Sequence, residues 1–261
     1  MLESHDFSGK TVFVAGGTSG INVESPARLR GAGARTAVVS RNAERVADAE
    51  AALKVLNPEN RGFICDVRDH AALEKVAAET AEALGPFDVV VSGAAGNFIA
   101  DAAALSPNGF KTVIDIDLLG TFNVFHATLP YLRTPGASLI AISAPQGSRP
   151  QQGQIHVCAA KAGVNMVVKC LALEWGRLGI RVNGISPGLI GDTEGQKRLF
   201  PTEESEARFI DDLPLQRLGR KADIADAALF LSSAAASFIT GVILDCDGGN
   251  ALAAGGHSFR S

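Results

Sequence analysis

The sequence lacks any cluster of basic residues, and this absence argues against the partners that such clusters attract. Its 24 Lys and Arg residues are scattered along the chain, and with 28 Asp and Glu residues they give a formal net charge of −4. Neither a nucleic acid nor a membrane surface is therefore an expected partner. We expect a small-molecule ligand.

Segments that address or anchor a chain are also missing. The first nine residues contain no basic stretch followed by an apolar run, and no later segment is expected to reach the length of a bilayer span. The last residues, Phe259, Arg260 and Ser261, do not match a peroxisomal address. A cytoplasmic protein is the prediction.

No linker, internal repeat or low-complexity tract divides the chain. With 46% hydrophobic and 20% charged residues, its 261 residues can bury one large core, and α/β folds of this size commonly form one unit. We therefore expect a single domain over residues 1–261.

Cysteine is scarce as well, with four residues and no paired spacing of the kind that binds a metal. They are Cys65, Cys158, Cys170 and Cys246, and most lie in apolar segments where a reduced thiol acts as a small hydrophobe. The expectation is free, structural thiols and no metal site.

What the sequence does contain is an alternation of two patterns. Short apolar runs predict seven strands, at Thr11–Ala15, Thr36–Ser40, Gly62–Cys65, Phe87–Val91, Ser138–Ser143, Ile180–Ile185 and Val242–Asp245. Longer segments with apolar residues at helical spacing lie between them, at 43–56, 71–84, 109–129, 161–178 and 221–232. This βαβ repetition predicts an α/β fold with a mainly parallel, doubly wound sheet of seven strands.

A glycine-rich turn follows the first predicted strand and leads into a helical segment. It contains Gly16, Thr18, Ser19, Gly20 and Ile21. Glycines let a backbone approach a pyrophosphate closely, and free N–H groups at a helix start favour its charge, so a Rossmann fold that binds a dinucleotide is predicted. The alternative is a plain strand-to-helix turn. Asn22 and Pro26 depart from the motif and are expected to distort the helix start.

The residues after the second predicted strand bear on the choice of dinucleotide. Ser40 and Arg41 stand where a site for NAD places an acidic residue. An arginine can bind a 2′-phosphate, so NADPH or NADP is favoured over NAD, unless Arg41 is merely solvated. The residues expected to line the adenine and its ribose at the same sheet edge are Asp66, Val67, Gly93, Ala94 and Ala95.

Several motifs in order resemble those of the short-chain dehydrogenase/reductase family. They are Gly16-x-x-x-Gly20, Asp66-Val67, Gly93–Gly96, Arg181-Val182-Asn183, Ser186-Pro187-Gly188 and Asp247-Gly248-Gly249. The resemblance implies that Pro187, Gly188, Ile190 and Lys161 also contact a nicotinamide dinucleotide. It further implies a homo-oligomer, commonly a tetramer, as do apolar residues in excess of one buried face near 157–178 and 234–249.

The catalytic tyrosine of that family is missing. Its position is occupied by Val157, that of the family serine by Ala144 and that of the family asparagine by Asp117, whereas Lys161 matches the family lysine. The chain's single tyrosine, Tyr131, lies away from this motif and is expected to pack. Because valine has no proton to give, the usual tyrosine relay is not expected.

One branch of the family resembles the chain at these departures: the peroxisomal-type 2,4-dienoyl-CoA reductases and their bacterial relatives. Four segments carry the similarity, at 93–98, 110–117, 154–161 and 187–195. The resemblance implies catalysis by Asp117, Lys161 and a water. From its own position beside an apolar stretch, His156 is a further candidate acid or a packed or capping residue. It also implies an NADPH-dependent reductase of a conjugated double bond in an unsaturated acyl-CoA, hence a role in fatty acid metabolism.

Two other functions remain open at this stage. The chain could be a catalytically silent dinucleotide-binding sensor or subunit, or a carbonyl or alcohol oxidoreductase that uses a different acid. For the substrate we expect contacts from Asn97, Phe98, Ser143 and Thr193, with a lid over about 189–213.

Overall fold

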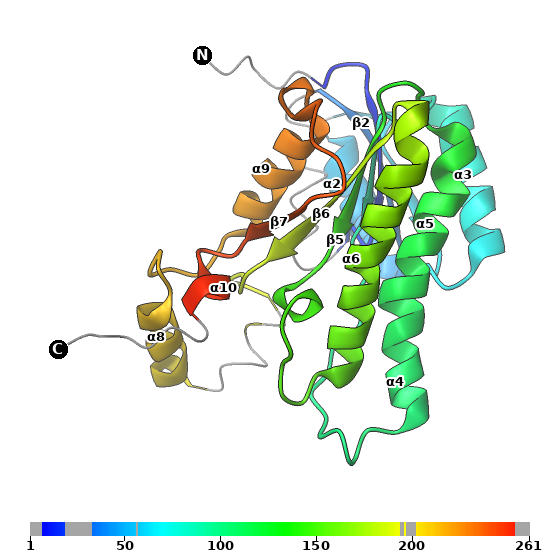
Figure 1. The fold of residues 1–261 in the computed structure, drawn as a ribbon. Helices are drawn as coiled ribbons and strands as arrows, with labels where there is room; N and C mark the ends of the chain where they lie inside the picture. Colours follow the sequence, from blue (N-terminus) through cyan, green and yellow to red (C-terminus); the bar gives the residue numbers. More distant parts are fainter. Residues whose placement is uncertain (1–6, 19–32, 56, 194–195, 197–201, 254–261) are drawn as a thin grey trace.

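The fold is a single parallel sheet with helices on both faces (Figure 1). The computed structural model describes residues 7–18, 33–55, 57–193, 196 and 202–253. The strands are β1 (Thr11–Ala15), β2 (Arg35–Ser40), β3 (Arg61–Ile64), β4 (Val89–Ser92), β5 (Ser138–Ile142), β6 (Arg181–Pro187) and β7 (Ile243–Cys246). Their order is β3-β2-β1-β4-β5-β6-β7, and every pairing is parallel. The predicted seven-stranded, doubly wound architecture is confirmed.

Helices and short helical turns make up the layers around this sheet. The α-helices are α2 (Ala43–Lys54), α3 (His70–Leu84), α4 (Pro107–Val113), α5 (Gly120–Thr128), α6 (Ile155–Trp175), α8 (Glu203–Asp212), α9 (Lys221–Ser232) and α10 (Asn250–Ala253). A π-helical segment, η2 (Ile114–Leu119), joins α4 to α5 in one rod. The 3-10 turns are η3 (Leu129–Tyr131), η4 (Pro145–Gly147), η5 (Gly176–Leu178) and η6 (Ala234–Ala236).

Each central strand is buried on both faces, which explains its continuous apolar sequence. In β1, Phe13 and Ala15 pack against the helices α3, α5 and α6, whereas Val12 and Val14 pack toward α2 and α9. Figure 1 shows these two helical layers on opposite sides of the sheet. Because all strands are parallel, their carboxyl ends meet at one edge, where ligands of such sheets bind.

Two helices begin two or more residues before their predicted starts. Helix α6 begins at Ile155, six residues before the predicted start, because helical contacts continue through 155–160 up to the turn at Gly153, whose φ is +73°. The rod predicted over 109–129 begins at Pro107, which Ser106 caps, and is interrupted by η2. A π-turn adds one residue without changing the apolar pattern, so the sequence does not reveal it.

The expectation that no segment reaches the length of a membrane span was wrong on length alone. Residues 155–178, which comprise α6 and η5, are long and apolar enough. Half of their most apolar window is buried within the structure, as in the core helix of a soluble protein, which passes the same test. The length and composition of residues 155–178 are therefore only weak evidence for a membrane-spanning helix.

The cysteines are free, as expected, but they do not share one environment. Cys65 is buried, whereas Cys170 is exposed. Burial raises the pKa of the Cys65 thiol to about 11, with a smaller effect from the nearby Asp69 and Asp66 carboxylates. No group of three metal-ligating side chains occurs among the residues that the structure describes.

Candidate active site

The turn after β1 is built for close backbone approach. Gly16 has a φ of +82°, and its N–H donates to the Val39 carbonyl at 2.8 Å. A Cβ at this position would lie 2.5 Å from the backbone nitrogen of Ala94, at the end of the neighbouring strand β4. Only glycine therefore fits where the β1 and β4 turns meet. Ser19, Gly20, Ile21, Asn22 and Pro26 lie outside the described residues.

Two buried hydroxyl groups at this edge have no hydrogen-bond partner among the described residues. A bound dinucleotide could supply one. Thr18 Oγ1, in the β1 turn, and Ser186 Oγ, near the end of β6, are buried without a hydrogen bond to the residues that the structure describes. A buried polar atom without a partner costs stability, so such atoms are expected where a ligand binds. The hydroxyls and the glycine turn fit a nicotinamide dinucleotide, with the phosphates at the turn.

Charged side chains follow the ends of β2 and β3. Arg41 Nη1 lies 3.8 Å from Asp66 Oδ2, and the Arg68 guanidinium forms hydrogen bonds with both oxygens of the same carboxylate. The hydrogen bonds from Arg68 lower the pKa of Asp66. Two guanidinium groups thus share one carboxylate next to Ser40.

The π-helical segment is held against the loop after β3. A Cβ on Gly120 would lie 2.6 Å from Val67 Cγ2, so the rod approaches Val67 closely at a glycine. One turn further on, Asn123 Nδ2 donates to the Val67 carbonyl at 2.9 Å. Val67 is 5% exposed and packs against the rod in the loop that follows β3. Asp117 lies in this segment, and π-turns are frequent at functional sites.

Asp117 and Lys161 form a buried ion pair at the centre of the carboxyl edge. Asp117 Oδ2 lies 3.1 Å from Lys161 Nζ, and both side chains are less than a tenth exposed. Asp117 Oδ1 accepts a hydrogen bond from the Gly96 N–H at 2.7 Å, and Lys161 Nζ donates to the Ile142 carbonyl at 3.0 Å. The pair therefore joins η2 and α6 to the loop after β4 and to the last residue of β5. Removing one partner would leave the other charge buried and uncompensated.

No tyrosine lies near this pair in the described structure. Val157 is buried one helical turn before Lys161, where it packs with Val113 and Ala160. Tyr131 packs edge-on against Phe87, at 6.2 Å between ring centroids. Phe87 comes just before β4, at the amino ends of the strands and thus away from the ion pair. The expected packing role of Tyr131 is confirmed.

Asn97 and Phe98, which were expected to meet the substrate, are anchored by the start of α6. Asn97 Oδ1 accepts a hydrogen bond from Gln154 Nε2 at 3.0 Å. The His156 ring lies 4.3 Å from the Phe98 ring between centroids, and its Nε2 is 3.1 Å from the Phe98 carbonyl oxygen. His156 is fully buried, and its Nδ1 has no partner among the described residues.

The remaining predicted site residues lie at the same edge. The Ser143 hydroxyl, directly after β5, donates to Asn165 Oδ1 at 2.5 Å. Pro187 ends β6, and Gly188 approaches Asp247 so closely that a Cβ would lie 2.6 Å from Asp247 Cα. In the predicted lid, Thr193 Oγ1 donates to the carbonyl of the buried Ile190 at 2.8 Å. Helix α8 forms the described end of that segment.

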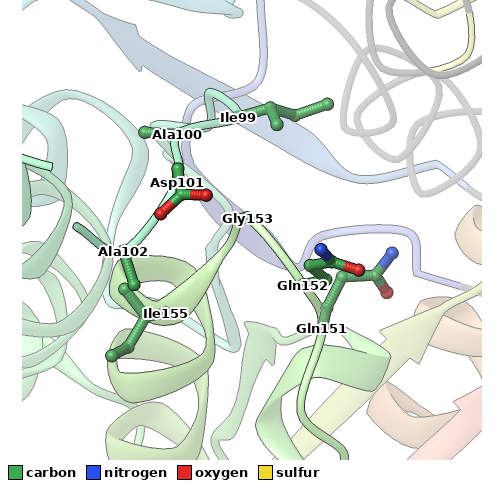
Figure 2. A pocket seen from close by; sticks show the side chains of 8 residues that line it. All are labelled: Ile99, Ala100, Asp101, Ala102, Gln151, Gln152, Gly153 and Ile155. Carbon is green, nitrogen blue, oxygen red and sulfur yellow. The ribbon is translucent and has the colours of Figure 1, made fainter. Parts of the chain in front are cut away.

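A cavity of about 680 Å³ opens beside these anchors. Its walls are two segments: residues 99–102 after β4, and residues 151–153 with Ile155 before and at the start of α6. Figure 2 shows Asp101, Ala102 and Ile155 on one side of it, and Gln151 and Gln152 on the other. The Ala100 N–H donates to the Gly153 carbonyl at 3.0 Å, so the two walls are joined. No lysine or arginine is among the described residues that line the cavity.

The sequence did not single out Gln154, Gln146 or Asn165 as members of the site. Gln154 is 3% exposed and accepts a hydrogen bond from Gln146 Nε2 at 2.7 Å. Both glutamines flank a turn rich in Gly, Pro and Gln, where a polar side chain normally indicates solvent. Only the burial of Gln154 and its hydrogen bonds to Asn97 and Gln146 identify them.

The fold and the site together fit a class of protein: α/β oxidoreductases that bind a nicotinamide dinucleotide. The family model described as enoyl-(acyl carrier protein) reductase matches residues 15–251. The chain belongs to the short-chain dehydrogenase/reductase family.

Two curated relatives illustrate the similarity in sequence. A peroxisomal 2,4-dienoyl-CoA reductase from Arabidopsis thaliana is 42% identical over 251 residues, covering 92% of this chain and 84% of the relative. A probable 2,4-dienoyl-CoA reductase from Bacillus subtilis is 36% identical and covers 93% and 97%.

Solved structures agree with the fold. A short-chain dehydrogenase from Bacillus anthracis has a TM-score of 0.84 at 34% identity, covering 97% of this chain and 99% of the other. A short-chain oxidoreductase from Pseudomonas aeruginosa, described as containing an atypical catalytic center, has a TM-score of 0.87 at 29% identity and covers 94% and 98%. The resemblance to a reductase family is confirmed, and the chain is an oxidoreductase. The silent dinucleotide-binding alternative is set aside.

Proposed function

We propose that this protein is an NADPH-dependent reductase that acts on the conjugated double bonds of a 2,4-dienoyl-CoA or a related unsaturated acyl-CoA. The observation that carries the proposal is the buried Asp117–Lys161 pair at the carboxyl edge, with Val157 in place of a tyrosine. The names of the relatives from Arabidopsis thaliana and Bacillus subtilis support the same substrate class.

The chemistry suits a site without a tyrosine acid. When bound, the nicotinamide dinucleotide supplies a hydride to the far end of the diene, and the electron pair moves toward the thioester oxygen as an extended enolate. That oxygen needs hydrogen-bond donors and positive potential more than it needs an immediate proton. Lys161 supplies the potential, and Asn97 contacts the substrate in this proposal. A water then protonates the carbon chain.

Asp117 acts by holding the other groups in place. Its two oxygens lie against the Lys161 ammonium and the Gly96 N–H. In this way it fixes the direction of the ammonium and the backbone of the loop that carries Asn97. It also offers an acceptor that can orient the water. The buried setting strengthens each of these electrostatic contacts compared with bulk water.

The choice of NADPH rests on the charges after β2 and β3. The carboxylate at this edge, Asp66, is already engaged by Arg68 and Arg41, so it is not left free to prefer a ribose hydroxyl. Arg41, whose side chain is 54% exposed, can turn to a 2′-phosphate.

A homo-oligomer is part of the proposal. Helix α6 exposes Ile155, Met166 and Leu173, and the segment before β7 exposes Phe238. Met166, Leu173 and Phe238 lie where the sequence showed apolar residues in excess of one buried face, and Ile155 lies two residues before that range. We propose a tetramer in the cytoplasm, with a single domain and a lid over 189–213. Light scattering on the purified protein and localisation of a tagged chain test the first two.

The direct test is a substrate panel. Purified protein is mixed with NADPH and, in turn, a 2,4-dienoyl-CoA, a 2-enoyl-CoA and a set of simple ketones, while loss of nicotinamide absorbance is followed. We expect turnover that depends on the thioester and is fastest with the diene. Turnover of ketones without any dependence on a thioester would instead support the carbonyl oxidoreductase that the sequence left open.

A further inference from the structure

His156 is a fully buried histidine that the proposed reaction does not use. Its ring lies against the Phe98 ring, at 4.3 Å between centroids, and its Nε2 lies 3.1 Å from the Phe98 carbonyl oxygen. Its Nδ1 has no hydrogen-bond partner among the described residues. The sequence left open whether this side chain is an acid or a packed or capping residue.

The contact with Phe98 determines which ring nitrogen of His156 carries the hydrogen. A carbonyl oxygen can only accept, so this hydrogen bond requires the hydrogen on Nε2. A second hydrogen, on Nδ1, would leave a buried N–H group without an acceptor among the residues that the structure describes. The ring is therefore held as the neutral tautomer with Nε2–H, and its one N–H hydrogen is already donated to the Phe98 carbonyl.

The place of His156 on α6 also separates it from the ion pair. An α-helix turns by about 100° per residue, so the five steps from His156 to Lys161 leave the two about 140° apart around the axis. Val157, one residue later, lies on nearly the same side of the helix as Lys161. His156 therefore contacts Phe98 from a different side of α6 than the one that carries the catalytic lysine.

The contact between His156 and Phe98 joins the two walls of the cavity. Ile155, the neighbour of His156 in sequence, lines one wall, and Ile99, the neighbour of Phe98, lines the other (Figure 2). A shift of Phe98 away from His156 would move these two wall residues relative to each other. The width of the cavity therefore depends on this contact.

Other contacts hold the same loop in place. A Cβ on Gly109 would lie 3.4 Å from Phe98 Cζ, so the tip of the Phe98 ring lies beside α4. The Ala100 N–H donates to the Gly153 carbonyl at 3.0 Å. Phe98 is thus packed against both α4 and α6, and two hydrogen bonds join its loop to residues 153–156.

The lining of the cavity suits an uncharged, largely apolar part of a ligand. Ile99 and Ile155 contribute apolar side chains, and no lysine or arginine is among the described lining residues. The Asp101 carboxylate, which also lines the cavity, would repel a phosphate. We therefore expect the phosphates of CoA to bind elsewhere, whereas an acyl chain fits here.

We infer that His156, as the neutral Nε2–H tautomer, is a positioning residue that holds Phe98 and thereby sets the width of a cavity that takes the acyl chain. It does not supply a proton to the substrate. The inference rests on the proposed function for the identity of the acyl chain. The tautomer and the contact with Phe98 are properties of the folded protein.

Two substitutions separate positioning from proton transfer. His156→Gln keeps an N–H donor near the place of Nε2 but cannot act as an acid. Its kcat should stay within about 10-fold of wild type, because loss of a general acid costs about 100–10,000-fold. His156→Phe keeps a ring beside Phe98 but leaves the carbonyl without its donor. The KM for 2,4-decadienoyl-CoA should rise by about 3–10-fold, with the KM for NADPH unchanged.

The length of the substrate tests what occupies the cavity. The chain of 2,4-hexadienoyl-CoA ends just after the diene, so His156→Phe should raise its KM less than that for 2,4-decadienoyl-CoA. His126→Phe makes the same exchange at an exposed position on α5 and should leave every KM at the wild-type value. A fall in kcat beyond about 10-fold in His156→Gln would overturn the inference. So would KM values for the two substrates that stay unchanged, or rise equally, in His156→Phe.

NMR of protein with isotopically labelled histidine nitrogens tests the tautomer without any substrate. The signals of His156 are identified by their loss in His156→Gln. A hydrogen on Nε2 alone would support the inference, whereas a hydrogen on Nδ1, alone or together with one on Nε2, would overturn it. If wild type reduces no acyl-CoA while the Nε2–H tautomer is found, the proposed function fails and the role of His156 in holding Phe98 stands.

Discussion

Replacing Gly16 with alanine should destabilise the protein more than the same change at another glycine of similar backbone conformation. Gly9 has a φ of +75°, close to the +82° of Gly16, and a Cβ there would meet nothing within 4 Å. At Gly16 the Cβ would lie 2.5 Å from Ala94 N and 2.8 Å from Ala94 Cα, which are backbone atoms that no side-chain rotation can move.

The two variants share the free-energy cost of a positive φ and differ in the cost of overpacking. A non-glycine residue with positive φ costs about 1–2 kcal/mol, and both variants carry this cost. Overpacking adds about 1–3 kcal/mol, and only Gly16→Ala carries it. At about 2–4 °C per kcal/mol for a chain of this size, Gly16→Ala should melt about 2–12 °C below Gly9→Ala.

Thermal and urea unfolding, followed by circular dichroism, measure this difference. NADPH titration should also show weaker binding to Gly16→Ala and unchanged binding to Gly9→Ala, because the clash moves the turn that is expected to hold the phosphates. Equal melting temperatures would refute the close approach of the β1 and β4 turns.

Two further predictions concern the cofactor edge and the thiols. Arg41→Ala should raise the KM for NADPH by about 10–100-fold, because a charge-assisted hydrogen bond is lost. The KM for NADH should stay nearly unchanged. Equal increases in both KM values would show that Arg41 does not bind the 2′-phosphate. Iodoacetamide at pH 8 should label the exposed Cys170 well before the buried Cys65, whose pKa is about 11. Labelling of Cys65 should accelerate as the pH approaches that value, because only the thiolate reacts, and mass spectrometry that finds Cys65 labelled first would contradict this reading.

The sheet could be predicted from the sequence because its signals are local. Each central strand is a continuous apolar run such as Thr11–Ala15, and helical spacing between the runs identifies parallel crossovers. The same alternation places the loops after all strands at one edge. That is why Gly16, Arg41 and Asp66 could be assigned to one site without coordinates.

Asp117 and Lys161 could be named only through a family resemblance, since nothing in their local sequence shows that they pair. The structure adds the contact, and with it the π-helical turn that carries Asp117. The start of α6 and the hydrogen bonds of Gln154 with Gln146 and Asn97 could not be predicted. The hydrogen bond from Gln154 to Asn97 joins residues 57 positions apart, and a polar residue beside Gly153 resembles an ordinary loop residue.

The ion pair provides the most direct measurement of the central claim. Asp117→Ala and Lys161→Ala are assayed with NADPH and a 2,4-dienoyl-CoA beside two matched controls, Asp115→Ala in the same π-helical segment and the exposed Lys169→Ala on α6. Turnover lost in the first two variants and kept in both controls, with all four proteins folded, is the predicted result. Wild-type turnover in Asp117→Ala or Lys161→Ala would contradict the account, because the buried pair would then take no part in the reaction.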